Sequence, residues 1–231
     1  MSELVVHALP AAWGLPSISP FCLKLEVWLR LAKLPYTTVV DATPFGAPKR
    51  KLPYIEHEGK RIGDSSFIID HLESRFGCGV DASLSPAERG AAHALKRLAE
   101  ENLYWVMVYD RWVVDENWRI FRDVVLGGVP AALRPVVAVV ARRGVRAQLK
   151  GHGIGAHARD EIHAIGRRDV AAIADFLGEK PYLMGARPTS VDASVYGLLT
   201  NIADAPIATP VKDDALGRAN LMAYVKRMAA V

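Results

Sequence analysis

Three short segments in the N-terminal third carry residue types that bind or activate a polar ligand. The first is Ser19-Pro20-Phe21-Cys22, which has the spacing of a redox cysteine pair with serine in place of the first cysteine. The second is Lys51-Leu52-Pro53-Tyr54, and the third is Asp64-Ser65, directly before an apolar run. Taken singly, each segment is weak evidence for a binding site, so the interpretation depends on the helices and strands that position the three segments.

Serine followed by proline is typical of a helix N-cap and the first helical position, so capping alone accounts for Ser19. A helix N-terminus also stabilises an anion, and a hydroxyl can donate to a thiolate while it accepts from the helix. Lowering a thiol pKa by about two units requires roughly 2.7 kcal/mol. A hydrogen bond to a charged group contributes about 1.5–3 kcal/mol, and a helix terminus about 0.3–1 kcal/mol. Both interpretations stay open, and Ser17 offers a rival hydroxyl.

The other two segments have a structural and a functional interpretation as well. Pro53 fits the start of an edge strand, or a cis Leu52–Pro53 bond that turns the Leu52 backbone toward a ligand. Asp64 and Ser65 fit a helix cap. Together they also fit a site in which helix N–H groups and the serine hydroxyl bind a carboxylate while Asp64 attracts an ammonium. An amino-acid head group carries both charges.

Other reactive residue types predict less chemistry. Cys22 has no partner cysteine at redox spacing, which excludes a dithiol cycle and favours a packing role. With only two cysteines, a reducing, cytoplasmic setting is expected. The spacing of His152, His157 and His163 fits no compact ligand set, so no metal is expected.

The periodicity predicts two domains in the 231 residues. Residues 1–78 predict the order β-α-β, a connection, and then β-β-α, with Lys24 pointing outward from the first helix. Residues 86–231 predict helices only, opening with a capping box in which Ser85 is the N-cap, Pro86 follows, and Glu88 stands at the third helical position. The fold class is therefore an α/β domain followed by an all-α domain.

Charge and hydropathy exclude several function classes. The net charge of +4 mildly favours anionic ligands, but the basic residues are dispersed and not interleaved with aromatics, so no nucleic acid is expected. The N-terminus lacks the pattern of a signal peptide. The apolar stretch Val124–Ala141 contains Arg134 and two prolines, which favours a buried helix over a transmembrane segment.

The order of the three segments resembles the glutathione transferase superfamily, whose N-terminal domain has a thioredoxin-like fold. "SPF" stands where some classes carry Cys-Pro-Phe and others a catalytic serine, "KLPYI" resembles the cis-proline segment after the second helix, and "DSS" resembles the γ-glutamyl motif. "PYLMGARPTSVDASVYGLL" resembles the C-terminal capping motif, with Thr189 or Ser190 before Asp192, a stability element. "SPFCLKLEVWLRLAKLPY" and "LYWVMVYDRW" are similar to the metaxin-like branch that includes failed axon connections proteins.

The resemblance implies roles for individual residues. Ser19 would contact the glutathione sulfur as the catalytic residue, and Leu52, shaped by Pro53, would pair with the cysteinyl backbone. Lys51 would meet the glycyl carboxylate, while Asp64 and Ser65 would hold the γ-glutamyl end. A second-substrate pocket between the domains would use the aromatic side chains of Trp13, Trp105, Tyr109 and Trp112.

These residues predict a glutathione-dependent transferase that conjugates the thiolate to an apolar electrophile, with glutathione as co-substrate. The resemblance also implies a homodimer. Two alternatives stay open: a non-catalytic binding or adaptor protein of the metaxin-like type, and a glutathione-dependent peroxidase or reductase.

Overall fold

The N-terminal part of the chain forms a small mixed sheet covered by two helices. The computed structural model describes residues 3–41 and 44–231. In spatial order the four strands are β2 (Thr37–Val40), β1 (Val5–Ala8), β3 (Tyr54–His57) and β4 (Lys60–Gly63). Strand β1 runs parallel to β2, with Val5 opposite Thr37, and antiparallel to β3, with Val5 opposite Glu56. This is the predicted β-α-β then β-β-α order of a thioredoxin-like domain.

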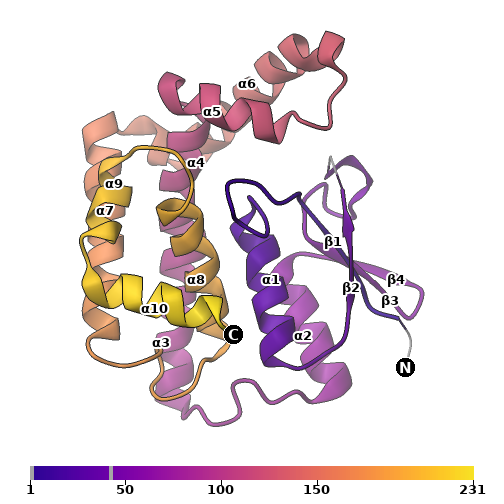
Figure 1. The fold of residues 1–231 in the computed structure, drawn as a ribbon, viewed down its shortest axis with the longest axis vertical. Coiled ribbons are helices and arrows are strands. Elements are labelled where there is room, and N and C mark those ends of the chain that lie inside the picture. Colours follow the sequence, from indigo (N-terminus) through magenta and orange to yellow (C-terminus); the bar gives the residue numbers. More distant parts are fainter. Residues whose placement is uncertain (1–2, 42–43) are drawn as a thin grey trace.

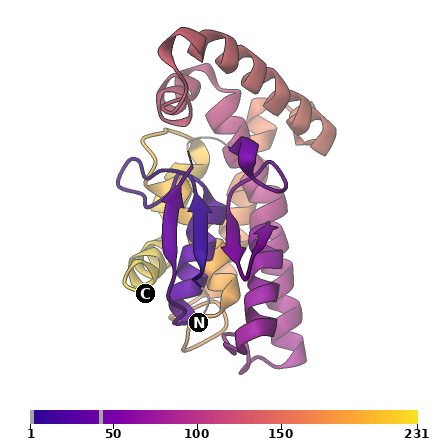
Figure 2. The ribbon, with the colours of Figure 1, turned by 90° about the vertical axis from the view of Figure 1, so that its right-hand side faces the viewer.

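Helices α1 (Pro20–Leu31) and α2 (Ser65–Phe76) lie between the sheet and the rest of the molecule (Figures 1 and 2). Alternation along β1 buries Val6 and Ala8. Between β2 and β3, the described residues form a single 3₁₀ turn, Pro44–Gly46, where the resemblance implied a second helix. Both helices begin at the upper end of the sheet in Figure 1, so the positive ends of their dipoles face the same region.

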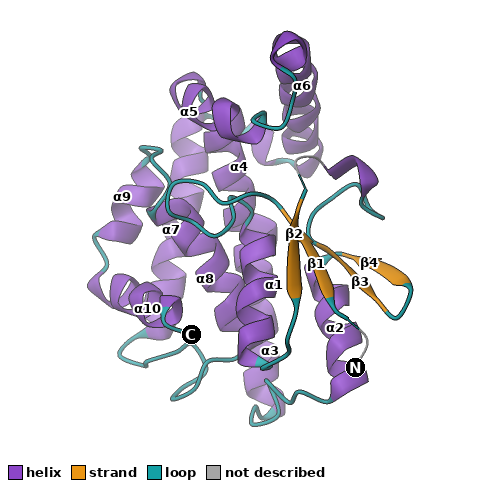
Figure 3. Cartoon of the chain, turned by 45° about the vertical axis from the view of Figure 1, so that its right-hand side comes forward, coloured by secondary structure: helices purple, strands orange, loops and turns teal. Residues whose placement is uncertain are grey.

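The rest of the chain is helical. The elements are α3 (Pro86–Arg97), a π-helical segment (Leu98–Leu103), α4 (Tyr104–Trp112), α5 (Asp115–Val125), α6 (Arg134–His152), α7 (Arg159–Leu177), α8 (Ser190–Ala203), α9 (Pro210–Leu216) and α10 (Ala219–Ala229). The predicted capping box is confirmed, because Ser85 accepts from the Glu88 backbone and the Glu88 carboxylate accepts from the Ser85 backbone. The arrangement of all elements is seen in Figure 3.

Helix α8 forms the centre of the helical part, since every residue from Val191 to Ala203 is buried. Its N-terminus is held by the predicted Thr189–Asp192 capping box, in which Asp192 accepts from the Thr189 backbone at 2.7 Å and from the Leu183 backbone at 2.9 Å. One face of α8 packs against α1. There a side chain at Gly197 has no room, because a Cβ would lie 2.6 Å from the carbonyl oxygen of Pro20.

The apolar stretch Val124–Ala141 is not the buried helix that the sequence predicted. It covers the end of α5 and the first part of α6, which projects from the body of the molecule (Figures 1 and 2). The side chains of Leu133, Val136, Val139 and Val140 are exposed, Val136 at 65%. No helix in the described ranges combines the length and the hydropathy needed to cross a membrane.

The close approach of α1 and α8 predicts the effect of a single methyl group. Gly197→Ala should lower the free energy of unfolding by about 1–3 kcal/mol, because the added Cβ must push the two backbones apart. Gly144→Ala is the matched control: Gly144 lies exposed in α6 with nothing within 4 Å of its Cβ position. That change should stabilise the protein by about 0.5–1 kcal/mol through helix propensity. Urea unfolding measures both, and equal effects would contradict the packing argument.

Candidate functional site

Ser19 caps α1 as its position before Pro20 predicted. Its Oγ accepts a hydrogen bond from the Cys22 backbone N–H at 3.3 Å. A hydroxyl that accepts in this way keeps its proton for another acceptor. The side chain is 8% exposed and lies at the positive end of the helix dipole. The group can therefore cap the helix and donate to an anion at the same time.

Ser17 is placed differently. Its hydroxyl donates to the Leu9 carbonyl at 3.1 Å and accepts from the Ser19 backbone N–H at 3.3 Å, and the residue is 0% exposed. The Ser17 proton is already used, and no solvent reaches the residue. Of the two hydroxyls, Ser19 is the better placed to meet a ligand.

Cys22 is a buried side chain one turn into α1. Burial raises the pKa of its thiol to about 11, although hydrogen bonding with Ser19, the Leu9 backbone and Ser17 opposes this rise. A thiol with this pKa is almost fully protonated at neutral pH and is a poor nucleophile. It packs in a small apolar cluster with Leu52 and Tyr54, which brings the second candidate segment close to the start of α1.

The second segment lies just before β3. The Leu52–Pro53 peptide bond is cis, and Leu52 is largely buried, whereas Lys51 is exposed. Within the part of the chain that the structure describes, the backbone N–H and C=O of Leu52 make no hydrogen bond. Backbone groups near a protein interior are nearly always paired, so Leu52 offers a donor and an acceptor to an extended ligand.

The third segment begins α2. Asp64 is the N-cap, with a φ of 83° that non-glycine residues seldom adopt, and its carboxylate accepts from the Ser66 backbone N–H at 2.9 Å. Non-glycine residues in rare backbone conformations of this kind cluster at active sites and ligand-binding segments. Ser65, the first helical residue, is buried. The free N–H groups of this helix end suit a carboxylate, and Asp64 suits a neighbouring ammonium.

The sequence did not indicate the ion pair that ties these helix ends together. The outward orientation predicted for Lys24 is wrong, because the residue is 1% exposed. Its Nζ lies 2.7 Å from Oε1 of Glu100, in the π-helical segment, and donates to Ser66 Oγ at 3.1 Å. Burial lowers the pKa of the Lys24 ammonium, and the Glu100 charge opposes that shift. Only the tertiary fold brings these three groups together.

The aromatic residues predicted for a second-substrate pocket separate into two places. Trp13 and Trp112 join an apolar cluster with Ile18, Trp118 and Phe121, next to the loop that precedes Ser19. The Trp13 and Phe121 rings lie 6.1 Å apart, and the Trp112 and Trp118 rings are stacked at 5.1 Å.

The other two aromatic residues contact different partners. Trp105 stacks on His152 at 4.9 Å, and Tyr109 lies against His163 at 6.5 Å. The structure has two small cavities, of about 20 and 10 Å³, and none of these four aromatic side chains lines either of them. Each cavity has room for about one water molecule. The cluster around Trp13 and Trp112 is therefore the part of the prediction that lies next to Ser19.

The three histidines considered as metal ligands point to separate partners. His163 lies 2.8 Å from Asp110, His152 hydrogen-bonds with the Glu101 carbonyl, and His157 lies near Glu161. Among the described residues, no group of three or more metal-binding side chains comes together.

Family models match both parts of the chain. A model described as the glutathione S-transferase N-terminal domain matches residues 20–117, and one described as the glutathione S-transferase C-terminal domain matches residues 166–228. The chain is 32% identical to the isoprene-epoxide–glutathione S-transferase of Rhodococcus sp. (strain AD45), over 97% of both proteins. The protein therefore belongs to the glutathione S-transferase family.

Two further relatives confirm the metaxin-like branch. Failed axon connections of Drosophila melanogaster is 31% identical, over 93% of this chain and 54% of that protein. Metaxin-3 of Xenopus laevis is 25% identical, over 94% of this chain and 69% of that protein. The fold is shared with a glutathione S-transferase from Methylobacterium radiotolerans solved in complex with glutathione sulfonate. The TM-score is 0.60 and the identity 20%, over 99% of this chain and 91% of that one.

The buried ion pair predicts a large stability effect. Lys24→Met should lower the free energy of unfolding by about 3–5 kcal/mol, since it leaves Glu100 desolvated without a cation. Arg97→Met is the control, because Arg97 forms an exposed pair with Glu101 one turn away, and it should cost less than about 1 kcal/mol. Chemical denaturation measures both. The double variant Lys24→Met/Glu100→Leu should recover most of the loss, and no recovery would contradict the pairing.

Proposed function

We propose that this protein is a transferase that conjugates the thiolate of glutathione to a small apolar electrophile. The observation that carries the proposal is the position of Ser19, whose hydroxyl lies at the N-terminus of α1 and accepts from the Cys22 backbone N–H there. The chain's family membership makes glutathione the natural thiol. Ser19 would donate to the sulfur, and the helix dipole would add to the stabilisation of the anion.

The remaining segments match the chemistry of the tripeptide. The unpaired backbone of Leu52, beside Pro53, would pair with the backbone of the cysteinyl residue. Exposed Lys51 would attract the glycyl carboxylate. At the start of α2, Ser65 and the helix N–H groups would bind the γ-glutamyl carboxylate, and Asp64 would bind its ammonium. Lys24, through Ser66 and Glu100, would keep this helix end in place.

In the reaction, the sulfur lone pair forms a bond to an electrophilic carbon while the bond from that carbon to its leaving group breaks. With an epoxide, the leaving group is the ring oxygen, which stays attached to the neighbouring carbon and takes a proton from water. Epoxides are the first class to test, because the Rhodococcus relative is named for one. The apolar cluster with Trp13 and Trp112 would face the electrophile.

Removal of the Ser19 hydroxyl tests the proposal. Ser19→Ala should lower kcat/KM for a vinyl epoxide and for a chlorinated nitrobenzene by about 10- to 100-fold, the equivalent of one hydrogen bond to a charged group. Glutathione affinity, measured by titration calorimetry, should change little, because most of the tripeptide is held elsewhere.

A second capping serine separates the two roles of Ser19. Ser85 caps α3, where its Oγ accepts from the Glu88 backbone N–H at 3.3 Å, the distance also found at Ser19. In the sequence, Ser85 is far from the three segments of the proposed site. Ser85→Ala should lower stability by about 1 kcal/mol, as loss of a cap does, without loss of activity. If Ser17→Ala abolishes activity and Ser19→Ala does not, the assignment of the hydroxyl is wrong. Failure of the wild type to bind millimolar glutathione would overturn the function itself.

A non-catalytic binding or adaptor role is the second candidate. The observation that favours it is the exposed apolar surface formed by Val136, Val139 and Val140 on the projecting α6 and by Leu133 directly before that helix, together with the similarity to Failed axon connections and metaxin-3. Glutathione binding without turnover across a broad electrophile panel would support this role over the transferase.

Two further expectations accompany the proposal. We expect a homodimer, which light scattering tests, and a cytoplasmic location, which fractionation tests. A peroxidase would use the same thiolate, with a hydroperoxide oxygen in place of the electrophilic carbon and a second glutathione to release the disulfide. Assays with an organic hydroperoxide distinguish it from conjugation.

A further inference from the structure

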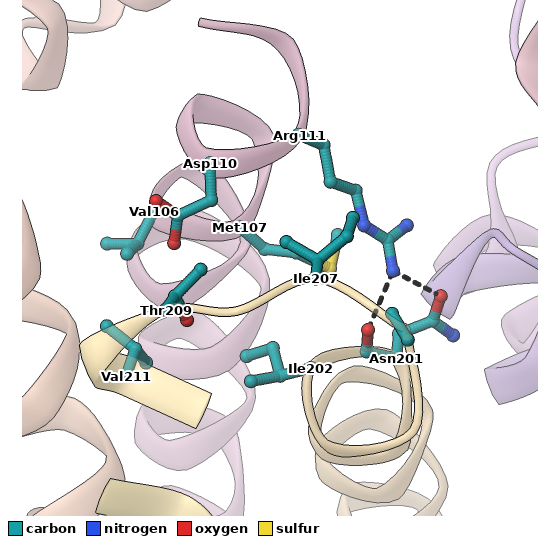
Figure 4. A pocket seen from close by; sticks show the side chains of 10 residues that line it. Val106, Met107, Asp110, Arg111, Asn201, Ile202, Ile207, Thr209 and Val211 are labelled. Carbon is teal, nitrogen blue, oxygen red and sulfur yellow. Dashed lines mark hydrogen bonds between the residues drawn. The ribbon is translucent and has the colours of Figure 1, made fainter. Parts of the chain in front are cut away.

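A buried arginine of the helical domain holds the loop that leads into Ser19. Arg111, on α4, is 3% exposed. Its Nη1 donates to the Ile18 carbonyl at 2.8 Å. Its Nη2 donates to the backbone and side-chain oxygens of Asn201 at 2.7 and 3.0 Å, as Figure 4 shows. The Asn201 amide in turn donates to the Ser17 carbonyl at 3.3 Å. The two carbonyls before Ser19 are thus both held by side chains from the other domain.

The charge of Arg111 has no carboxylate partner among the described residues. The neighbouring carboxylate, Asp110, is paired with His163 at 2.8 Å. The Arg111 guanidinium lies instead over the rings of Trp13 and Phe121, at 5.8 and 5.4 Å. Burial lowers the pKa of Arg111 to about 10, with the Tyr104 hydroxyl and Asp110 opposing, so the group remains a cation at neutral pH.

A buried cation held only by neutral acceptors is costly, because no opposite charge in contact offsets its loss of hydration. Structural support alone would be met by a neutral donor at each carbonyl. The Arg111 cation hydrogen-bonds the carbonyl of the peptide unit that joins Ile18 to Ser19, and it lies in a low-dielectric interior. There it favours a negative charge at the start of α1.

We propose that Arg111, assisted by Asn201, is a positioning residue for the thiolate of glutathione. It fixes the Ser17–Ser19 backbone so that the Ser19 hydroxyl faces the sulfur, and its positive charge, which has no carboxylate in direct contact, stabilises the anion. The inference rests on the proposed function, since it requires that glutathione binds at Ser19. It extends that function to two residues of the helical domain, neither of which is expected to touch glutathione.

The ionisation of bound glutathione tests the proposal. The ultraviolet absorbance of the thiolate, followed against pH in the complex with saturating glutathione, gives the pKa of the bound thiol. Arg111→Met should raise that pKa by about one unit, which reduces the thiolate fraction about tenfold at a pH below both values. Arg111→Lys, which keeps the charge but cannot donate to both partners in the same way, should give an intermediate pKa.

Arg142 provides the matched control. It also donates to two backbone carbonyls, those of Trp112 and Val113, at 2.7 and 2.8 Å, and it also lies over an aromatic ring, that of Trp118. Unlike Arg111, it pairs with a carboxylate, Asp115, and it does not contact the Ser17–Ser19 loop. Arg142→Met should leave the pKa of the bound thiol unchanged.

The outcomes separate this inference from the proposed function. A wild type that does not bind millimolar glutathione, or leaves its thiol pKa at the free value, contradicts the proposed function and this inference with it. A wild type with a lowered thiol pKa that Arg111→Met does not change, or that Arg142→Met changes equally, overturns this inference alone. If Arg111→Met does not fold, Arg111→Lys and Asn201→Ala carry the test. A raised thiol pKa in either supports the inference, and an unchanged pKa in both overturns it.

Discussion

The packing of α1 against α8 is the constraint on which the rest of the structure depends. Gly197 lets the two backbones approach so closely that a single Cβ would collide with the carbonyl of Pro20. The Trp28 indole N–H, farther along α1, donates to Ser190 at the start of α8 at 2.9 Å. Helix α1 therefore belongs to the core of both domains. Any group at its N-terminus is held from both sides, and a rigid site at that position follows from the packing.

Polar groups of the helical domain reinforce this contact around the candidate site. Glu100 meets Lys24 from the π-helical segment, and Arg111 and Asn201 hold the backbone before Ser19. These contacts are buried, so removal of one partner from any of them should strongly lower the stability of the protein. The thioredoxin-like domain supplies the groups expected to touch glutathione, and residues of the helical domain bind the backbone and side chains beside those groups. A chain that lost turnover and kept its fold would still need the same contacts, which is why an adaptor role is compatible with this architecture.

Local chemistry made much of the molecule predictable from its sequence. The caps at Ser19, Asp64, Ser85 and Thr189 involve residues three or fewer positions apart, so a short motif is enough to locate them. The order of strands and helices in the first domain was predictable for the same reason, since each element has a local sequence pattern.

Contacts between distant segments account for what the sequence did not predict. Lys24 looked like a solvent-facing residue because its helix was assumed to have a polar side, but α1 is covered on both sides and the ammonium finds Glu100, 76 positions later. Arg111 lies 93 positions from Ile18, and no short motif marks that pair. For Val136 and its apolar neighbours on α6 the prediction was wrong in the opposite sense, because burial was expected and the side chains are exposed. Hydropathy alone cannot distinguish a buried helix from an exposed apolar one.

The central claim is that the N-terminus of α1, with Ser19, binds the glutathione sulfur. A crystal structure of the complex with glutathione tests it most directly. The account predicts the sulfur within hydrogen-bonding distance of Ser19 Oγ, with the cysteinyl backbone against Leu52 and the γ-glutamyl end at Asp64 and Ser65. A structure without bound glutathione in crystals grown with millimolar glutathione would contradict the claim. So would glutathione bound with its sulfur against Ser17 or away from α1.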